Sequence, residues 1–561
     1  MKKYIPITFL TLAFLVAIIT RFYKLGLAPA GLYLDEAAQG YNAYSILKTG
    51  KDEFGKWFPI VFRSFNDFKT PVYIYLIVPL LPIFDLTKFT VRFPSFFFSI
   101  LTIPVIYLLI KEIAPKKHGE ILGAITAILL SISPWHILFG RTNFECNVAL
   151  FFSLTGFYFF YKSLQKPSFL ILSAIFLAIA IPSYHAQRVV TPLLSLALFL
   201  RHKDLLLSKS HRIYLIPGLI ISAIILIPTI SVSFTPGFLA RAAGLNIFSH
   251  QNQLPAGYLE NYEGPFSAFI NNSWFLTSKE FIALYFSYFS PRNMFILGDY
   301  GPRSSFPGLS TFFIWQFPFY IIGIYRFLRS KKLSELKYFT LTFLLIAPLP
   351  AAVTRDPYSS IRSLQMVIPI LIIMGYGILN TYEHIMSLIN QRHMKLSVFY
   401  FSIGSISSFI LIYSLLKLYS SVLVLNEYYR ASEWNYGFEQ VSDRIKTLDP
   451  KLPIVVDNAR SEPYSQLLFF LKFDPKIYQE ENFEVTLNEY YTNMNRNKTK
   501  VIGNIVTRPI SWKEDLITEK YLIGDNLSVS YEQIKNNNLT LIDEIHYPDG
   551  SLSFIIVRTN P

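Results

Sequence analysis

Two adjacent carboxylates, Asp35 and Glu36, stand in the run YLDEAAQGY (33 to 41), directly after the first apolar segment of the chain. The loop that begins there continues to Asp67 and Lys69. A carboxylate can accept a proton from a hydroxyl group, and a cation beside it can bind a phosphate. These residue types indicate a site for a hydroxyl-bearing acceptor and a phosphate-bearing lipid.

The two acids also fit a purely structural role at the start of a helix. Asp35 is a suitable N-cap, and Glu36 would favour the first turn of a helix predicted over 36–48 through the helix dipole. Tyr41 and Tyr44, three residues apart, would lie on one face of that helix. An acid at a helix start, a nearby cation and aromatic walls are also what a sugar-transfer site requires. Both interpretations stay open at this point.

The composition is that of a polytopic membrane protein. The chain has 561 residues, of which 52% are hydrophobic, with a mean hydropathy of +0.36 and apolar runs of membrane-spanning length. Residues 1–420 carry a net charge of +19 and residues 421–561 a net charge of −5. The basic residues of the first part lie in short loops between apolar runs, so they indicate membrane topology and not nucleic-acid binding.

Metal and disulfide chemistry have little support in the sequence. The single cysteine, Cys146, excludes an intramolecular disulfide and a Cys-based zinc site. The nine histidines show no metal-ligand spacing. We therefore expect no obligatory metal or other cofactor.

Eleven membrane-spanning helices are predicted for an α-helical transmembrane domain over residues 1–420. They cover residues 5–23, 92–110, 121–138, 145–161, 168–183, 189–200, 213–232, 309–327, 338–353, 363–382 and 396–420. The segment 71–84 is apolar but short and holds three prolines, so we predict a juxtamembrane or re-entrant segment on the outer face.

Loop charge decides this topology. If 71–84 does not cross, the basic loops fall on the side of Lys2 and Lys3, as the positive-inside rule requires. The N-terminus is then cytoplasmic and begins an uncleaved first helix. The first loop (24–91), the long loop 233–308 and the region after residue 420 are then exported.

Residues 421–561 have the composition of a small α/β or α+β extracytoplasmic domain. Short apolar runs alternate there with polar stretches. The segment 540–559 predicts a β-hairpin with its turn at 548–551. No phosphate-binding glycine loop occurs in this region, so we expect a lid, an acceptor-binding module or a scaffold.

Several features of the first part resemble the GT-C glycosyltransferases. In order, these are an apolar helix, LDE followed by a helix rich in Ala and Tyr, the segment KTPVY (69 to 73), and VRFPS (91 to 95) opening the next span. The order is similar to that of the branch containing protein O-mannosyltransferases and lipid A aminoarabinose transferases. The resemblance covers residues 5–200 and, more loosely, 300–385. It implies a membrane enzyme that takes a sugar from a polyprenyl-phosphate donor.

The resemblance also implies roles for residues of the first loop. In this family the first-loop Asp is the proposed general base, which corresponds to Asp35, and Glu36 would shape its protonation or bind the acceptor. Lys69 corresponds to the lysine of a Lys-Pro-Pro segment, although Thr70 replaces one proline. Lys69, with Asp67 nearby, would face the lipid phosphate. Cations suit that role because the leaving phosphate gains negative charge in the transition state.

Further candidates for donor binding begin or end predicted spans on the exported side. They are Arg92, Tyr184, His185, Arg188, Arg355 and Arg362. Interfacial anchoring explains Tyr184 and Arg188 equally well, and Arg92 could orient a helix through an ion pair. Asp356 could simply neutralise Arg355. A role in binding is favoured for Arg362, since an Arg that opens a span is costly unless an anion pairs with it.

The combined expectation is an inverting transfer of one sugar, a mannose-like hexose or a pentose, from a polyprenyl phosphate to a hydroxyl group of a protein, lipid or glycan at the outer face of the plasma membrane. Two alternatives stay open. A secondary transporter or flippase would place ionisable residues near the membrane midplane. A noncatalytic scaffold would leave Asp35, Glu36 and Lys69 without chemistry. The catalytic interpretation requires Asp35 and Lys69 to lie close together.

Overall fold

The computed structural model describes residues 5–65, 67–116, 118–249, 264–267, 272–391, 396–481, 486–493 and 496–561. Lys2, Lys3 and residues 251–263 of the predicted long exported loop lie outside this part. The chain forms two compact units. The helical unit comprises Met1–Tyr23, Ser95–Ser231 and Arg241–Ser421, and the mixed unit comprises Lys24–Pro94, Val232–Ala240 and Val422–Pro561.

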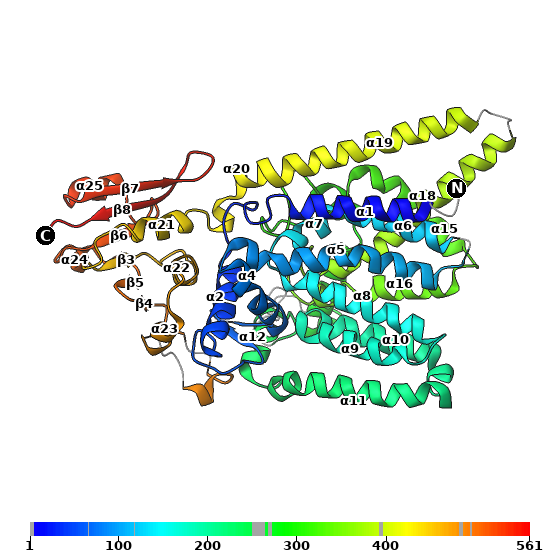
Figure 1. The fold of residues 1–561 in the computed structure, drawn as a ribbon, viewed down its shortest axis with the longest axis horizontal. Coiled ribbons are helices and arrows are strands. Elements are labelled where there is room, and N and C mark those ends of the chain that lie inside the picture. Colours follow the sequence, from blue (N-terminus) through cyan, green and yellow to red (C-terminus); the bar gives the residue numbers. More distant parts are fainter. Residues whose placement is uncertain are drawn as a thin grey trace. The chain divides into compact units, whose positions relative to one another are not determined.

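The helical unit is built from apolar helices (Figure 1). They are α1 (Ile5–Phe22), α5 (Lys88–Ile113), α6 (Gly119–Ser131), α7 (Pro134–Arg141), α8 (Glu145–Ser163), α9 (Phe169–Ser183), α10 (Gln187–Leu206), α11 (Lys209–Val232), α12 (Pro236–Leu245), α14 (Ser273–Ser287), α15 (Phe317–Arg329), α16 (Ser334–Ile346), α17 (Leu349–Ala352), α18 (Val367–Gln391) and α19 (Leu396–Ser420), with short turns at η3 (Asn293–Leu297), η4 (Ile314–Gln316) and η5 (Leu364–Met366). Helices α5, α11 and α12, and the single turn η6 (Ser421–Leu425), have residues in each unit.

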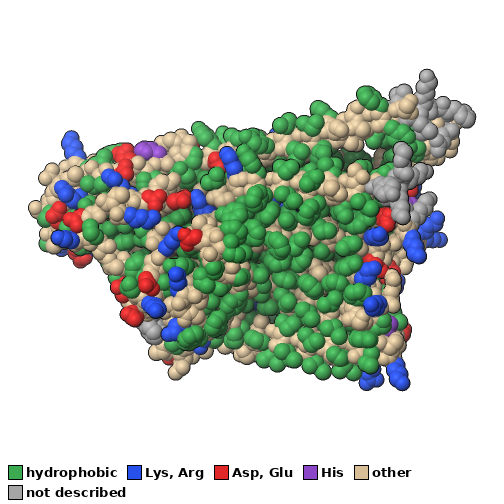
Figure 2. Space-filling model, in the orientation of Figure 1, with side chains coloured by type: hydrophobic (Ala, Val, Ile, Leu, Met, Phe, Trp, Pro, Cys, Tyr) green, Lys and Arg blue, Asp and Glu red, His purple; other side chains and the backbone are tan. Residues whose placement is uncertain are grey.

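Several of these helices are long and apolar enough to cross a membrane. Among the described residues, five helices meet that description, or six if a bent pair is one span. In Figure 2 hydrophobic side chains cover most of the visible face of this unit, and Lys and Arg side chains gather at one end. The chain is therefore a multi-pass membrane protein. Each of the eleven predicted spans overlaps a helix, but the number that cross, and their direction, stay predictions.

The predicted span 121–138 is wrong as a single helix. It is divided into α6 and α7, which meet at an angle of 60°. The cause is Pro134, because a residue that precedes proline avoids the α conformation and Ser133 has φ −64° and ψ 118°. The last carbonyls of α6 then lack helical partners, and the buried Arg21 guanidinium donates to those of Leu130 (3.1 Å) and Ser131 (2.9 Å).

The mixed unit contains a six-stranded sheet in the order β4-β5-β3-β6-β8-β7. The strands are β3 (Ile454–Val456), β4 (Lys500–Ile502), β5 (Ile505–Thr507), β6 (Tyr521–Gly524), β7 (Thr540–His546) and β8 (Leu552–Arg558). Strand β3 pairs in parallel with β5 and β6, and the other pairs are antiparallel. The predicted hairpin is confirmed, since β7 and β8 pair and a turn closes at Tyr547 and Gly550 (2.9 Å).

Helices and a second, small sheet complete this unit. They are α2 (Leu34–Thr49), β1 (Phe62–Ser64), β2 (Asp67–Lys69), α3 (Pro71–Ile77), η1 (Val78–Leu80), α4 (Leu81–Phe84), η6 (Ser421–Leu425), α20 (Asn426–Arg430), η7 (Ser432–Trp434), α21 (Phe438–Ile445), α22 (Pro463–Leu471), α23 (Pro475–Glu481), η8 (Leu487–Glu489), α24 (Trp512–Asp515) and α25 (Tyr531–Asn536). The prolines of 71–84 break that segment into three short pieces.

The first loop and the C-terminal region share one hydrophobic core. Tyr41 of α2 packs with Leu467 and Leu468 of α22 and with strand residues such as Ile454. The Tyr41 hydroxyl also donates to the Phe473 carbonyl (3.1 Å). The predicted domains, 1–420 and 421–561, stay a prediction, and the structure adds that Lys24–Pro94 and the C-terminal sheet form one compact unit.

Candidate active site

The side chain that caps the start of helix α2 is that of Glu36, not that of Asp35. Tyr33 occupies the N-cap position, and its backbone N–H donates to Glu36 Oε2 (3.0 Å). Asp35 lies inside the first turn, so its proposed role as N-cap is wrong. The helix ends at Gly50, whose φ of 71° lets its N–H donate back to the Ile46 carbonyl.

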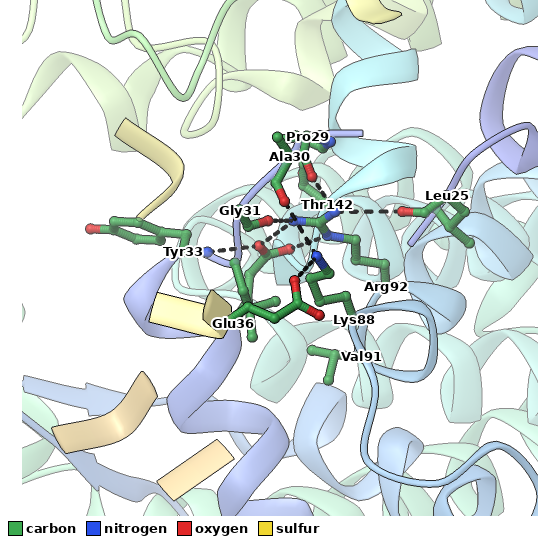
Figure 3. Close-up of polar contacts among 12 residues, drawn as sticks. Leu25, Pro29, Ala30, Gly31, Tyr33, Glu36, Lys88, Val91, Arg92 and Thr142 are labelled. Carbon is green, nitrogen blue, oxygen red and sulfur yellow. Dashed lines mark hydrogen bonds and ion pairs between the residues drawn. The ribbon is translucent and has the colours of Figure 1, made fainter. Parts of the chain in front are cut away.

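Glu36 forms a fully buried ion pair with Arg92 (Figure 3). Arg92 Nε donates to Glu36 Oε1 (3.0 Å) and Nη2 donates to Oε2 (2.9 Å). The same guanidinium donates to the carbonyls of Pro29 (2.9 Å) and Gly31 (2.6 Å). Arg92 therefore ties the segment before α2 to the start of α5. We propose a structural role for Glu36 and Arg92 in place of the predicted contacts with substrate.

Asp35, in contrast, pairs with Lys69 at a partly open site. Lys69 Nζ lies 3.0 Å from Asp35 Oδ1 and 4.0 Å from Asp67 Oδ2. The side chain of Lys69 is 9% exposed, whereas those of Asp35 and Asp67 are 23% and 25% exposed. The structure thus brings together Asp35, Asp67 and Lys69, three of the four charged first-loop residues that the sequence singled out. Water or a substrate can reach both carboxylates.

The hairpin β1–β2 positions Lys69. Phe62 pairs with Lys69 and Ser64 pairs with Asp67 in antiparallel register. Because side chains alternate along a strand, Asp67 and Lys69 lie on the same face of the hairpin. Pro71 then begins α3 two residues later, which ends the strand.

The C-terminal region holds this hairpin through Tyr490. The buried Tyr490 hydroxyl accepts from the Arg63 backbone N–H on β1 (2.7 Å) and donates to Asp52 Oδ2. Asp52 also accepts from the backbone N–H groups of Phe54 (3.0 Å) and Lys56 (2.8 Å). Burial raises the pKa of Asp52 to about 6. Sequence analysis missed this network, since Asp52 and Tyr490 are 438 positions apart.

Cations and aromatic rings alternate beside the same hairpin. Lys500 Nζ lies 5.6 Å from the ring centroid of Phe54 and 5.5 Å from that of Tyr464. The guanidinium of Arg496 lies 5.4 Å from the ring of Phe65, in the β1–β2 turn. The contacts with Phe54 and Phe65 connect the first loop to the region after residue 460.

The helical unit contains the other predicted donor-binding residues. Tyr184 is buried, and its hydroxyl donates to the Ile361 carbonyl (3.3 Å), so the 184–188 segment contacts the 354–362 turn. Arg362 pairs with Asp356 (3.3 Å), and Arg355 pairs with Glu280 (2.9 Å). These ion pairs give Asp356 and Arg355 other partners than each other, and the alternative that they satisfy one another stays a prediction. Predicted roles of His185 and Arg188 in binding stay predictions.

Residues of the 354–362 turn line a cavity of about 370 Å³. Thr354, Arg355, Asp356 and Arg362 supply its polar lining. A buried carboxylate that the sequence did not indicate, Asp299, accepts from the Ser360 backbone N–H (2.7 Å) and so fixes the turn. Burial raises the pKa of Asp299 to about 6.

The described residues hold no group of three or more His, Cys, Asp or Glu side chains placed to bind a metal ion. The expectation that no metal is obligatory stays a prediction.

Comparison with known proteins bears on this arrangement. Residues 68–231 match the family model of dolichyl-phosphate-mannose-protein mannosyltransferases. The crystal structure of ArnT from Cupriavidus metallidurans bound to undecaprenyl phosphate is similar over 99% of both chains, with 11% identity and a TM-score of 0.54. The match over residues 68–231 and the fold shared with ArnT both support the GT-C glycosyltransferase superfamily. The predicted resemblance and the prediction of a glycosyltransferase are confirmed.

Other comparisons complete the account. The apo structure of the same ArnT covers 99% of this chain and 98% of its own, with 12% identity and a TM-score of 0.52. The archaeal oligosaccharyltransferase AglB from Archaeoglobus fulgidus, in complex with an inhibitory peptide and a dolichol-phosphate, has 13% identity and a TM-score of 0.49, over 99% of this chain and 74% of that chain. No curated protein matches the chain significantly.

Proposed function

We propose that this GT-C glycosyltransferase moves one sugar from a polyprenyl-phosphate donor to a hydroxyl acceptor at the outer face of the membrane, with Asp35 as the general base. The observation that carries the proposal is the contact of 3.0 Å between Asp35 and Lys69 at a partly open site. Asp35 is exposed enough to meet an acceptor, whereas Glu36 is sealed and paired with Arg92.

The reaction that this site supports is a single displacement. Asp35 accepts the proton of the acceptor hydroxyl as its oxygen bonds to the anomeric carbon of the sugar. The bond from that carbon to the phosphate oxygen breaks, and the lipid phosphate leaves with one more negative charge. An attack from the opposite side inverts the anomeric configuration. Lys69 has three N–H donors, so it can contact Asp35 and still donate to a phosphate oxygen.

A lipid phosphate is the donor group that the cations fit best. Arg355 and Arg362 line the cavity beside the 354–362 turn, and we propose that they bind donor phosphate. We propose the same role for Tyr184, whose hydroxyl contacts the Ile361 carbonyl, and for His185 and Arg188, which follow it in the chain. The similarity to an ArnT structure bound to undecaprenyl phosphate supports a polyprenyl carrier. The distribution of basic loops supports a cytoplasmic N-terminus.

The experiment is a transfer assay in vesicles that contain the purified protein and a labelled polyprenyl-phosphate hexose or aminopentose. Transfer of the label to a hydroxyl acceptor, with release of polyprenyl phosphate, is the expected result. Movement of intact labelled lipid between leaflets without release would instead support the flippase alternative. The absence of both activities with every donor would contradict the proposal.

A further inference from the structure

A second cavity lies in the helical unit, between the end of α10 and the connection from α15 to α16. Its volume is about 610 Å³. Four cations are among its lining residues, and they are Arg201, Arg329, Lys331 and Lys337. Ser330, Ser334 and Thr342 add hydroxyl groups.

The positive charge of this cavity is only partly neutralised. Arg201 pairs with Glu335 (2.9 Å), and His202 lies 3.2 Å from the other oxygen of the same carboxylate. Among the residues that the structure describes, Arg201 is the one of the four lining cations that has a carboxylate partner. Lys337 instead donates to the Leu328 carbonyl (2.6 Å). An anion of charge −1 or −2 would therefore complete the site electrostatically.

Two of these cations are held in place by aromatic rings. The Arg201 guanidinium lies 5.1 Å from the ring centroid of Tyr338, and that of Arg329 lies 4.3 Å from the ring of Tyr325. Such stacking limits the rotamers of both arginines before a ligand binds. Arginine in this state is well suited to two-pronged contacts with phosphate oxygens.

Apolar stripes lead from the membrane-facing surface to the cavity. On α15, Ile321, Tyr325 and Leu328 are 47%, 50% and 53% exposed, and their spacing of four and three residues places them on one helix face. Leu328 itself lines the cavity. On α10, Leu193, Leu196 and Leu200 are likewise exposed at 39%, 53% and 58%, and Arg201 follows directly.

The first and last residues of each stripe are seven positions apart, which corresponds to about 10 Å of helix. A water-soluble anion would use the cations but not these stripes. A lipid uses both, because its phosphate can bind among the cations while its chains cover the exposed leucines.

We infer that this cavity binds the headgroup of an anionic phospholipid of the surrounding bilayer, at a site that shares no residue with the proposed sugar-transfer site. The lipid phosphate contacts Arg329, Lys331 and Lys337, and its acyl chains lie along α10 and α15. The site stabilises the connection between α15 and α16 in the membrane.

The test uses the full-length protein in detergent, titrated with dioleoylphosphatidylglycerol or dioleoylphosphatidylcholine and measured by native mass spectrometry. The wild type is expected to retain phosphatidylglycerol in preference to phosphatidylcholine. The double variant Lys331→Gln, Lys337→Gln is expected to bind phosphatidylglycerol about 30-fold more weakly, since each lysine near a lipid surface contributes about 1 kcal/mol. Lys331→Arg with Lys337→Arg is expected to restore binding.

A matched control is the double variant Lys116→Gln, Lys166→Gln, which removes the same charge from other basic loops. Neither residue lines the cavity. Equal losses of phosphatidylglycerol affinity in the two double variants would overturn the site, because they would show that the lipid is attracted by the net charge of the protein alone. Equal retention of both lipids, or equally tight binding of water-soluble glycerophosphoglycerol, would overturn the lipid assignment.

Discussion

Replacing Glu36 with Ala should destabilise the mixed unit, although its neighbour Asp35 can be changed with little effect on stability. The substitution removes both bonds from Arg92 and the acceptor for the Tyr33 N–H. Arg92 would remain fully buried with only backbone carbonyls as partners. A buried charge that has lost its partner is the costly case.

The expected magnitude follows from this geometry. Removing one member of a buried ion pair costs about 3–5 kcal/mol of unfolding free energy. Loss of the capping acceptor adds about 1 kcal/mol. Asp35→Asn should cost at most about 1 kcal/mol, because the Asp35 carboxylate is partly exposed and water can replace its partner.

The assay is thermal unfolding of the wild type, Glu36→Ala and Asp35→Asn in the same detergent, followed by near-ultraviolet circular dichroism. The midpoint should fall strongly for Glu36→Ala and stay near the wild-type value for Asp35→Asn. Arg92→Lys should not preserve stability, since an ammonium cannot reproduce the two parallel bonds of the guanidinium. Equal midpoints for Glu36→Ala and the wild type would refute the structural role of this pair.

Three further predictions concern the hairpin and its supports. Lys69→Gln should lower the transfer rate by about 10²-fold or more, with Lys69→Arg less damaging, as measured by turnover of labelled donor, because one preorganised cation is lost from the leaving phosphate. Tyr490→Phe should lower the unfolding free energy by about 1–3 kcal/mol in chemical denaturation, since the Arg63 N–H loses its buried acceptor. The pKa of Asp52 is raised to about 6, so the stability that its protonated form contributes is complete below pH 4 and is lost as the pH rises through 6. The unfolding free energy of Asp52→Asn should therefore rise by about 3 kcal/mol relative to that of the wild type between pH 4 and pH 7, as measured in unfolding titrations. If the difference in unfolding free energy between the two proteins is the same at both pH values, the raised pKa of Asp52 is contradicted.

The sequence singled out the charged residues of the first loop, but it did not show which of the two acids is buried in an ion pair and which is accessible. Asp35 and Lys69 could be singled out because acids are rare in this region and the order of segments resembles a known family. Glu36 is buried because it pairs with Arg92, which is 56 positions away in the sequence. No local sequence pattern reveals that Arg92 is buried. The N-cap preference of Asp35 was overridden because Glu36, one residue later, accepts from the backbone while paired with Arg92.

The lengths of the apolar runs predicted where the helices lie, but they did not predict where a run is broken into two helices. Pro134 is visible in the sequence, yet the surrounding apolar run extends on both sides and conceals the break between α6 and α7. Contacts of the first loop with Tyr490 and Tyr464 could not be predicted, because they join segments about 400 positions apart or more. The position of the β-hairpin 540–558 was predictable, since its turn chemistry is local.

The most direct test of the account compares Asp35→Asn with the wild type in the transfer assay, with Asp85→Asn as the matched control. Asp85 belongs to the same loop and pairs with Lys472 at a largely exposed position, so its substitution changes charge equally without touching Asp35 or Lys69. We expect Asp35→Asn to lose about 10²–10⁴-fold in transfer rate while it keeps its unfolding midpoint, and Asp85→Asn to retain full activity. Transfer by Asp35→Asn at the wild-type rate would contradict the assignment of Asp35 as the general base.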